Sequence, residues 1–154
     1  METIRQQIVD TVVAELKRIT IANGFRTNLW NSVFEWYSTP FETGELPALI
    51  IRDIDELIDK ASAETRRHLR KLHIQIEIVA SGEDSPEEIR KMLGDVEQAV
   101  ANGRKSDWGG FSKLTEGRLS RSVVEQESNR ISGATVEFFI HYATHAFSSY
   151  DALP

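Results

Sequence analysis

The sequence contains no cysteine, only four prolines, and no run of apolar residues long enough to cross a bilayer. The lack of cysteine excludes disulfides, thiol catalysis and cysteine-ligated zinc or iron–sulfur centres. A membrane-spanning helix needs about 18 or more consecutive apolar residues. The first residues include Glu2 and Asp10 and lack the apolar core of a signal peptide. We therefore expect no membrane segment.

Positive charge is also scarce. Lysine and arginine number 18 against 24 aspartates and glutamates, which gives a formal net charge of −6 and a pI near 5.3. General binders of nucleic acid or of anionic membranes need net positive potential on the binding face, so this balance argues against both. The 154 residues are 40 % hydrophobic and 27 % charged, which is ordinary globular composition. We expect one domain over residues 1–154.

Hydrophobic periodicity predicts two amphipathic helices. Apolar residues recur at three- and four-residue steps over residues 3–22, and Asn23-Gly24 is a natural stop for that helix. The segment Ser85-Pro86-Glu87-Glu88 has the pattern of a capping box and opens a second helix. Asn102-Gly103 predicts its end.

The remaining pattern predicts strands over residues 29–37, 48–54, 68–80, 118–127 and 134–147. The clearest is 68–80, because apolar and polar residues alternate along it. The charged residues 55–67 are expected to form a connection. Mobile loops are predicted near 38–47 and 103–117, and the tail 148–154 is expected to fray.

The predicted fold class follows from the order α-β-β-β-α-β-β. It is an α+β domain, with an antiparallel-rich mixed sheet of four to five strands and two amphipathic helices packed on one face.

Two groups of residues could hold a metal. His141 and His145 share one face of a predicted strand, but two histidines fall short of the three or four ligands that zinc needs. Asp53, Asp55 and Glu56 end another strand, where divalent-metal nucleases often place carboxylates. One alternative function is therefore a small metal-dependent hydrolase or nuclease that uses Asp53, Asp55 and a histidine. Solvated carboxylates are the simpler interpretation, so no catalytic residue, metal or cofactor is predicted.

A short basic run could meet phosphate or an acidic protein, or could pair with the nearby acids of residues 53–59. Strand alternation would place Arg70 on the same side as Leu72, so the run does not predict one continuous basic face. The run consists of Arg66, Arg67, His68, Arg70 and Lys71.

Large aromatic residues occur in two segments that are rich in glycine or proline. Trp108 and Phe111 flank Gly109-Gly110, and they either fold back onto the core or anchor a partner protein. The same two interpretations apply to Trp30, Trp36, Tyr37 and Phe41. A second alternative function is therefore a host adaptor that binds one protein through Trp108 and Phe111.

Taken in order along nearly the whole chain, these pieces resemble the tail terminator family of long-tailed phages, the lambda-like minor tail protein U and its relatives. The segment Leu46-Pro47-Ala48-Leu49-Ile50-Ile51 looks like the family's "LPAL" start of a strand. Residues 1–17 are similar to its first helix, 72–78 to its central strand and 85–99 to its second helix. The closing segment 136–144 looks like its final strand, which ends in a "Y-x-T" signature.

The resemblance implies a structural role without catalysis. Copies of the chain would form a ring, usually a hexamer, that caps the tail tube and ends its polymerisation. The ring would then present a surface to the head–tail connector protein. DNA would pass through the lumen without specific binding, and the protein would be found in the virion tail and, during assembly, in the host cytoplasm.

No family motif assigns the interface residues, so the candidates come from the loops 39–47 and 107–111 and from the polar face of 118–127. They are Pro40, Phe41, Glu42, Glu45, Asp107, Trp108, Phe111, Arg118, Arg121 and Glu125.

Overall fold

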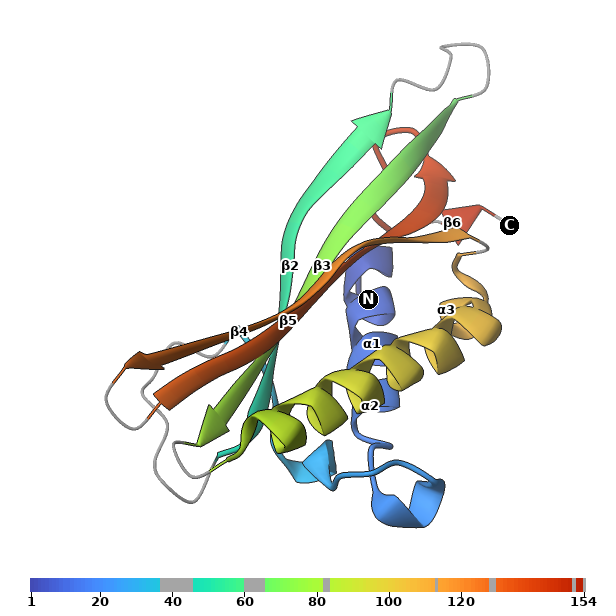
Figure 1. Ribbon diagram of the computed structural model, residues 1–154. Coiled ribbons are helices and arrows are strands. Elements are labelled where there is room, and N and C mark those ends of the chain that lie inside the picture. Colours follow the sequence, from blue (N-terminus) through green and yellow to red (C-terminus); the bar gives the residue numbers. More distant parts are fainter. Residues whose placement is uncertain are drawn as a thin grey trace.

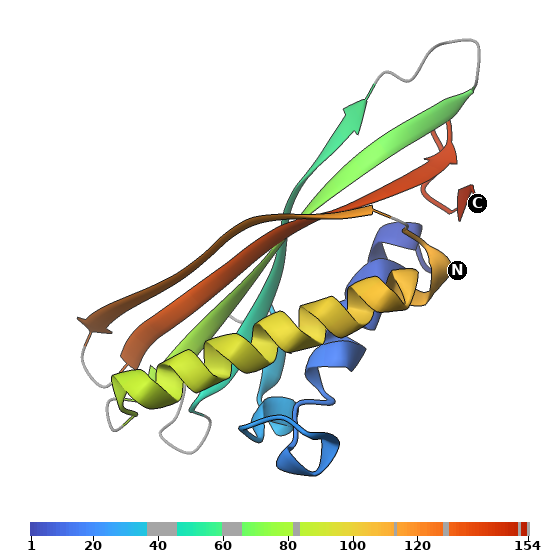
Figure 2. The ribbon, with the colours of Figure 1, turned by 45° about the vertical axis from the view of Figure 1, so that its right-hand side comes forward.

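The computed structural model describes residues 1–36, 46–59, 66–81, 84–112, 114–127, 130–150 and 152–153, with only the backbone at 59, 118–127, 130–133 and 152–153. Over these residues the chain is an α+β domain. A twisted mixed sheet has the strand order β1-β2-β3-β5-β4, and a short β6 pairs with β5. Figures 1 and 2 show α1 and α2 on the same face of this sheet, as the sequence predicts.

Three long strands form the middle of the sheet. They are β2 (Ala48–Asp59), β3 (Arg67–Ser81) and β5 (Arg130–His145), which pair antiparallel in that order. At one edge β1 (Val33–Glu35) runs parallel to β2, and at the other β4 (Leu114–Glu127) runs antiparallel to β5. The short β6 (Ala152–Leu153) lies beside the end of β5.

The core lies between the sheet and the two helices. Alternate residues of β3, from Leu72 to Ala80, are buried together with Val136, Phe138 and Ile140 of β5. The helices α1 (Ile4–Leu16) and α2 (Pro86–Lys105) supply the opposite wall. The period-two pattern of residues 68–80 therefore predicted the buried face of the central strand.

The charged residues after Ile54 do not form the predicted connection, because β2 continues to Asp59. A register shift between Asp53 and Asp55 changes the face of the sheet to which the following side chains point. Glu56 therefore lies opposite Leu72 on the helix-covered face. Its carboxylate meets the guanidinium of Arg70 there, 2.8 Å away. A partner on the next strand thus keeps this charged segment in the sheet.

The first helix ends at Leu16, earlier than predicted. The chain then forms a 3-10 turn over Ile21–Asn23, where the Thr20 side chain accepts a hydrogen bond from the Asn23 N–H. Gly24 follows with φ = 89°, a left-handed conformation that glycine adopts freely. The expected stop signal therefore ends the short turn and not α1.

The second helix begins as predicted. Ser85 and Glu88 form both hydrogen bonds of the capping box, and Pro86 occupies the first turn. A cap of this kind contributes about 1 kcal/mol. The predicted end at Asn102-Gly103 is wrong, because the helix continues to Lys105. Gly103 is buried inside it, and an added Cβ there would collide with the ring of Trp108.

The segments expected to be a mobile loop, 103–117, and a frayed tail, 148–154, include residues of a helix and of two strands. Residues 103–105 belong to α2, and β4 begins at Leu114; between them the element α3 (Asp107–Gly110) is a tight turn with positive φ at all four residues. In the tail, the Ser149 carbonyl accepts a hydrogen bond from the Ile4 N–H, and β6 pairs with β5. The expected loop at 38–47 falls largely outside the described residues. Of the helices that the structure describes, none is both long and apolar enough to cross a membrane.

Candidate functional site

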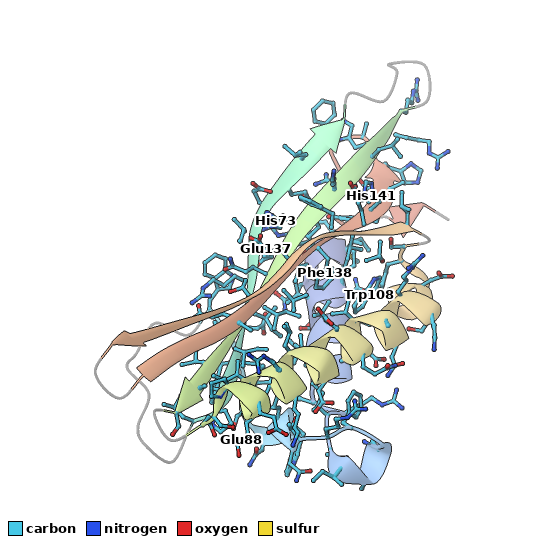
Figure 3. The ribbon with its side chains drawn as sticks, in the orientation of Figure 1. His73, Glu88, Trp108, Glu137, Phe138 and His141 are labelled. Atoms are coloured by element: carbon cyan, nitrogen blue, oxygen red, sulfur yellow. The ribbon has the colours of Figure 1, made fainter. Side chains whose placement is uncertain are left out.

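Trp108, a predicted interface residue, is a core residue. Its side chain is 0 % exposed, its ring stacks on Phe138 with centroids 5.7 Å apart, and its Nε1–H donates to Thr115 Oγ1 at 2.8 Å. Figure 3 shows both rings between α2 and the sheet. Phe111 is partly buried and packs against the same core. Of the two interpretations for this segment, the fold-back onto the core is the one observed.

The other predicted interface residues divide into three groups. Asp107 is half-buried at the start of α3, with φ = 51°. Arg118, Arg121 and Glu125 lie on the edge strand β4, where the structure describes the backbone. The predictions at Tyr37, Pro40, Phe41, Glu42 and Glu45 lie outside the described residues.

The sheet face opposite α1 and α2, which we call the outer face, carries ordered rows of polar and aromatic residues. Strand register places Asp55, His73, Phe139 and Glu116 in one row across β2, β3, β5 and β4. The neighbouring row, toward the β2–β3 hairpin tip, contains Leu57, Lys71, His141 and Leu114. Figure 3 shows His73, Glu137 and His141 along the two central strands of this face.

His73 lies at the centre of the outer face and is buried although it points away from the helices. Its Nδ1 is 3.7 Å from Asp55 Oδ1, and its ring packs on Phe139 with centroids 4.7 Å apart. Its Nε2 lies 3.4 Å from Glu137 Oε1 but has no hydrogen-bond partner. This imidazole therefore sits between the carboxylates of Asp55 and Glu137.

Glu116 joins the two rows. Its Oε2 is 3.1 Å from Lys71 Nζ and 3.2 Å from His141 Nε2, and these hydrogen bonds lower the pKa of Glu116 below its ordinary 4.5. Lys71 also sits 4.3 Å from the centroid of the Phe139 ring. The outer face is therefore held together by cross-strand pairs, with positive and negative groups interspersed.

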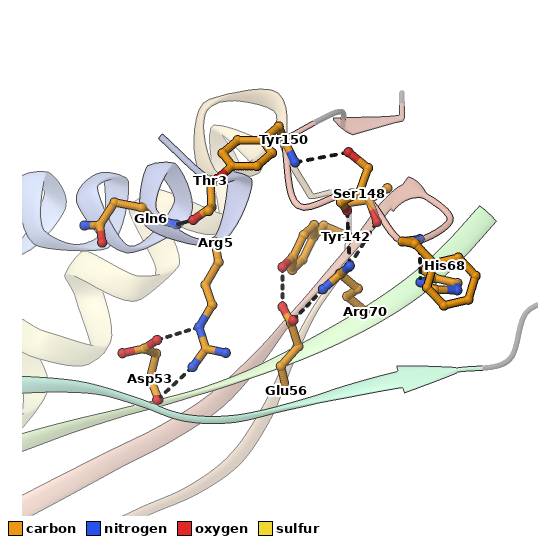
Figure 4. Close-up of polar contacts among 12 residues, drawn as sticks. Thr3, Arg5, Gln6, Asp53, Glu56, His68, Arg70, Tyr142, Ser148 and Tyr150 are labelled. Atoms are coloured by element: carbon orange, nitrogen blue, oxygen red, sulfur yellow. Dashed lines mark hydrogen bonds and ion pairs between the residues drawn. The ribbon is translucent and has the colours of Figure 1, made fainter. Parts of the chain in front are cut away.

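A second polar group, which we call the Arg70 cluster, lies on the helix-covered face near the tail. Arg70 pairs with Glu56 and donates to Thr144 Oγ1 at 3.0 Å and to the Ser148 carbonyl at 3.1 Å. Tyr142 donates its hydroxyl hydrogen to Glu56 as well. Burial, followed by this hydrogen bond, raises the pKa of Tyr142 well above its ordinary 10.0. Figure 4 shows the cluster tying β2, β3 and β5 to the tail.

Asp53 is the centre of a third contact on the helix-covered face (Figure 4). Arg5 of α1 donates from Nε to Asp53 Oδ2 at 2.6 Å, as Figure 4 shows. Trp36 Nε1–H donates to Asp53 Oδ1 at 2.6 Å. Burial opposes ionisation of this carboxyl, but the hydrogen bonds from Trp36 and Arg5 and the Arg5 charge outweigh it. The pKa of Asp53 is therefore lowered from 3.8.

This lowered pKa predicts an acid-sensitive contribution to stability. It should be fully present above the unfolded value of 3.8 and decline as the pH falls through the folded pKa. Urea unfolding should therefore show Asp53→Asn less stable than the parent at about pH 7, with the gap narrowing as the pH falls below 3.8. Asp10→Asn is the control, since Asp10 is exposed and its carboxylate accepts a hydrogen bond from the neighbouring Gln6 side chain on the same helix. A gap independent of pH would contradict this assignment.

The predicted carboxylate cluster does not converge on one site. Asp53 lies opposite Ile74 on the helix-covered face, whereas Asp55 lies opposite His73 on the outer face. Glu56 belongs to the Arg70 cluster. Across the part of the chain that the structure describes, no group of three or more His, Asp or Glu could hold a metal ion. The structure therefore places Asp53 and Asp55, which the hydrolase alternative would use together, on opposite faces of the sheet.

The basic run is divided in the same way. Arg70 is buried on the side of Leu72, as strand alternation predicts, and Lys71 points to the outer face. Arg66 and Arg67 are exposed at the hairpin. Arg70 and Lys71 therefore form ion pairs within the chain, with Glu56 and Glu116 respectively.

Exposed apolar side chains gather at the strand edges and at the projecting hairpin. On the outer face these are Leu57, Leu69 and Leu114, and Ile58 is exposed on the opposite side of the hairpin. Trp30 and Trp36 are also about half exposed, near the ends of η2 (Leu29–Asn31) and β1. Exposed apolar side chains that form a contiguous patch are typical of a surface that meets another protein, whereas single ones occur on most protein surfaces.

The comparisons with known proteins supply no family. No family model matches the chain, and no curated protein is significantly similar to it.

Sequence reasoning missed Glu116 and gave His73 no role beyond the polar side of its strand. The signal was available in part, because alternation predicted that His73 and Phe139 point away from the core. The pairing of their strands, which brings them together, depends on register and cannot be obtained from periodicity.

Proposed function

We propose that this chain is a structural protein of a phage tail that assembles as a ring on the end of the tail tube. In this role it ends tube polymerisation and offers a surface for joining the head. The partners are further copies of the chain, the tail tube protein and the head–tail connector protein. The site of action is the virion tail.

The proposal rests on the position of the exposed apolar side chains in the sheet. Both long helices cover one face of the sheet. On the outer face, the charged and aromatic side chains of the central strands contact one another. Exposed leucines remain at the two edges of that sheet. A subunit that joins its copies head-to-tail in a ring uses two different surface patches, and exposed leucines at two opposite edges suit such a contact.

The sequence resemblance adds the particular role. The chain has its segments in the order found in the tail terminator family: the first helix, the "LPAL" segment, the central strand, the capped second helix and the closing strand. The acidic balance of −6 also suits a ring through which DNA slides, because repeated negative charge does not hold the duplex.

Light scattering over a rising protein concentration, followed by negative-stain electron microscopy, tests the proposal. We expect closed rings of uniform diameter at high concentration, or rings bound at the ends of tail tubes. A protein that stays monomeric at the highest concentration and leaves tube ends bare would contradict it.

A further inference from the structure

At each edge of the described sheet, a strand segment has no neighbouring strand on its outer side. Among the described residues, β1 pairs only with Leu49–Ile51 of β2, so residues 52–59 have no neighbour on that side. At the opposite edge, and within the part of the chain that the structure describes, β4 pairs with β5 alone. Figures 1 and 2 show these edges on the two sides of the sheet. An unpaired strand presents a row of backbone donors and acceptors that another strand can satisfy.

The directions of the strands make these edges complementary to each other. β2, β3, β5 and β4 each run antiparallel to the next. A second copy in the same sheet orientation therefore brings its β4 alongside β2 with antiparallel direction. The contact between copies would then continue the antiparallel order of the strands inside the domain.

The side chains at the two edges also match. Leu57 and Leu114 stand at opposite ends of one row, Leu57–Lys71–His141–Leu114, and both point to the outer face. Leu57 is 61 % exposed and Leu114 is 56 % exposed. When the row continues into a second copy, these leucines become cross-strand neighbours and are removed from water.

We infer that copies of this chain associate through β2 (residues 52–59) of one copy and β4 of the next, with Leu57 packed against Leu114. The neighbouring row brings Asp55 toward Glu116, whose charge is balanced by Lys71 within its own chain. Because two different edges meet, the contact is head-to-tail and generates a ring or an open array. The inference rests on the proposed function in naming the partner as a second copy.

The absence of cysteine makes a direct cross-linking test possible. Leu57→Cys and Leu114→Cys chains, one carrying a size tag, are mixed at high concentration and oxidised. Side chains of directly opposed residues lie about 4.5–5.5 Å apart at Cβ, close to the disulfide range. We expect a mixed dimer of one tagged and one untagged chain, and the same product with a short bismaleimide.

Ile58→Cys is the matched control for Leu57→Cys. Ile58 is adjacent and also exposed, but it lies opposite Arg70, on the other face of the sheet. It should therefore give little product with Leu114→Cys. A Leu57→Cys homodimer would indicate a two-fold contact and overturn the inference. Failure of both reagents to link Leu57→Cys with Leu114→Cys would also overturn it.

A second variant measures the same contact without cross-linking. Leu57→Arg should raise the concentration at which assembly occurs by at least about tenfold, because the leucine contact is lost. Ile21→Arg changes a residue of similar exposure away from both edges, and it should leave assembly unchanged. Equal effects of the two variants would contradict the inference.

The outcomes for the inference and for the proposed function are distinguishable. Rings that form without the Leu57–Leu114 cross-link would reject this interface and keep the ring. A cross-linked assembly that never occupies a tube end would reject the tail role and keep the interface.

Discussion

Replacing Trp108 with alanine is expected to lower the free energy of unfolding by about 3–5 kcal/mol, the usual loss when a large buried aromatic is truncated. The indole is fully buried, stacks on Phe138 and donates to Thr115. It also fills the space above Gly103, where no side chain could fit. Chemical denaturation at neutral pH measures the effect.

Backbone geometry adds to the importance of Trp108. Asp107 and Trp108 have φ near 50°, a left-handed conformation that costs residues other than glycine of order 1–3 kcal/mol each. Burial of the indole holds the turn in this conformation, so truncation should also loosen residues 107–112. Amide hydrogen exchange should show faster exchange there in Trp108→Ala.

Two variants serve as controls for this prediction. Trp108→Phe keeps a ring beside Phe138 but loses the hydrogen bond to Thr115, and its loss should be smaller. Trp30→Ala removes an indole that is 49 % exposed and should change stability by about 0.5 kcal/mol or less. Similar losses for Trp30→Ala and Trp108→Ala would show that Trp108 is not the core residue described.

Replacing Arg70 with methionine is expected to cost about 3–5 kcal/mol, because it leaves the buried Glu56 carboxylate without its cation. Glu56 and Arg70 are each less than one-tenth exposed at the side chain. Arg70 also holds the Ser148 carbonyl and Thr144. Urea unfolding measures the loss, and hydrogen exchange should show the tail released from β5.

A double variant separates the buried charge from the lost packing. Glu56→Gln combined with Arg70→Met removes both charges, so it should recover much of the stability lost in Arg70→Met alone. Arg52→Met is the matched control, since Arg52 pairs with Glu77 at 2.9 Å on the more open outer face. It should cost about 1 kcal/mol or less. A double variant no more stable than Arg70→Met would contradict the role given to Glu56.

Local patterns predicted the parts of the fold that local chemistry determines. The alternation of residues 68–80 gave the central strand and its buried face, and Ser85 with Glu88 gave the start of α2. The order of elements and the single helix-covered face followed from these. In each case the residues that make the signal also make the contact.

The errors arose where distant residues decide the structure. Residues 55–59 look like a charged connection, yet they belong to β2 because Arg70 neutralises Glu56. Trp108 resembles an exposed anchor beside two glycines, yet Gly103 in α2 leaves room for its ring. The rows of the outer face depend on the register of four strands, which no single segment contains.

Arrest of tail-tube growth is the most direct test of the proposed function. Tube protein is polymerised with increasing amounts of this chain, growth is followed by light scattering, and tube ends are imaged by electron microscopy. The predicted result is that growth stops as the chain is added and that each arrested tube carries a ring at one end. Tubes that keep growing with bare ends, in the presence of excess chain, would contradict it.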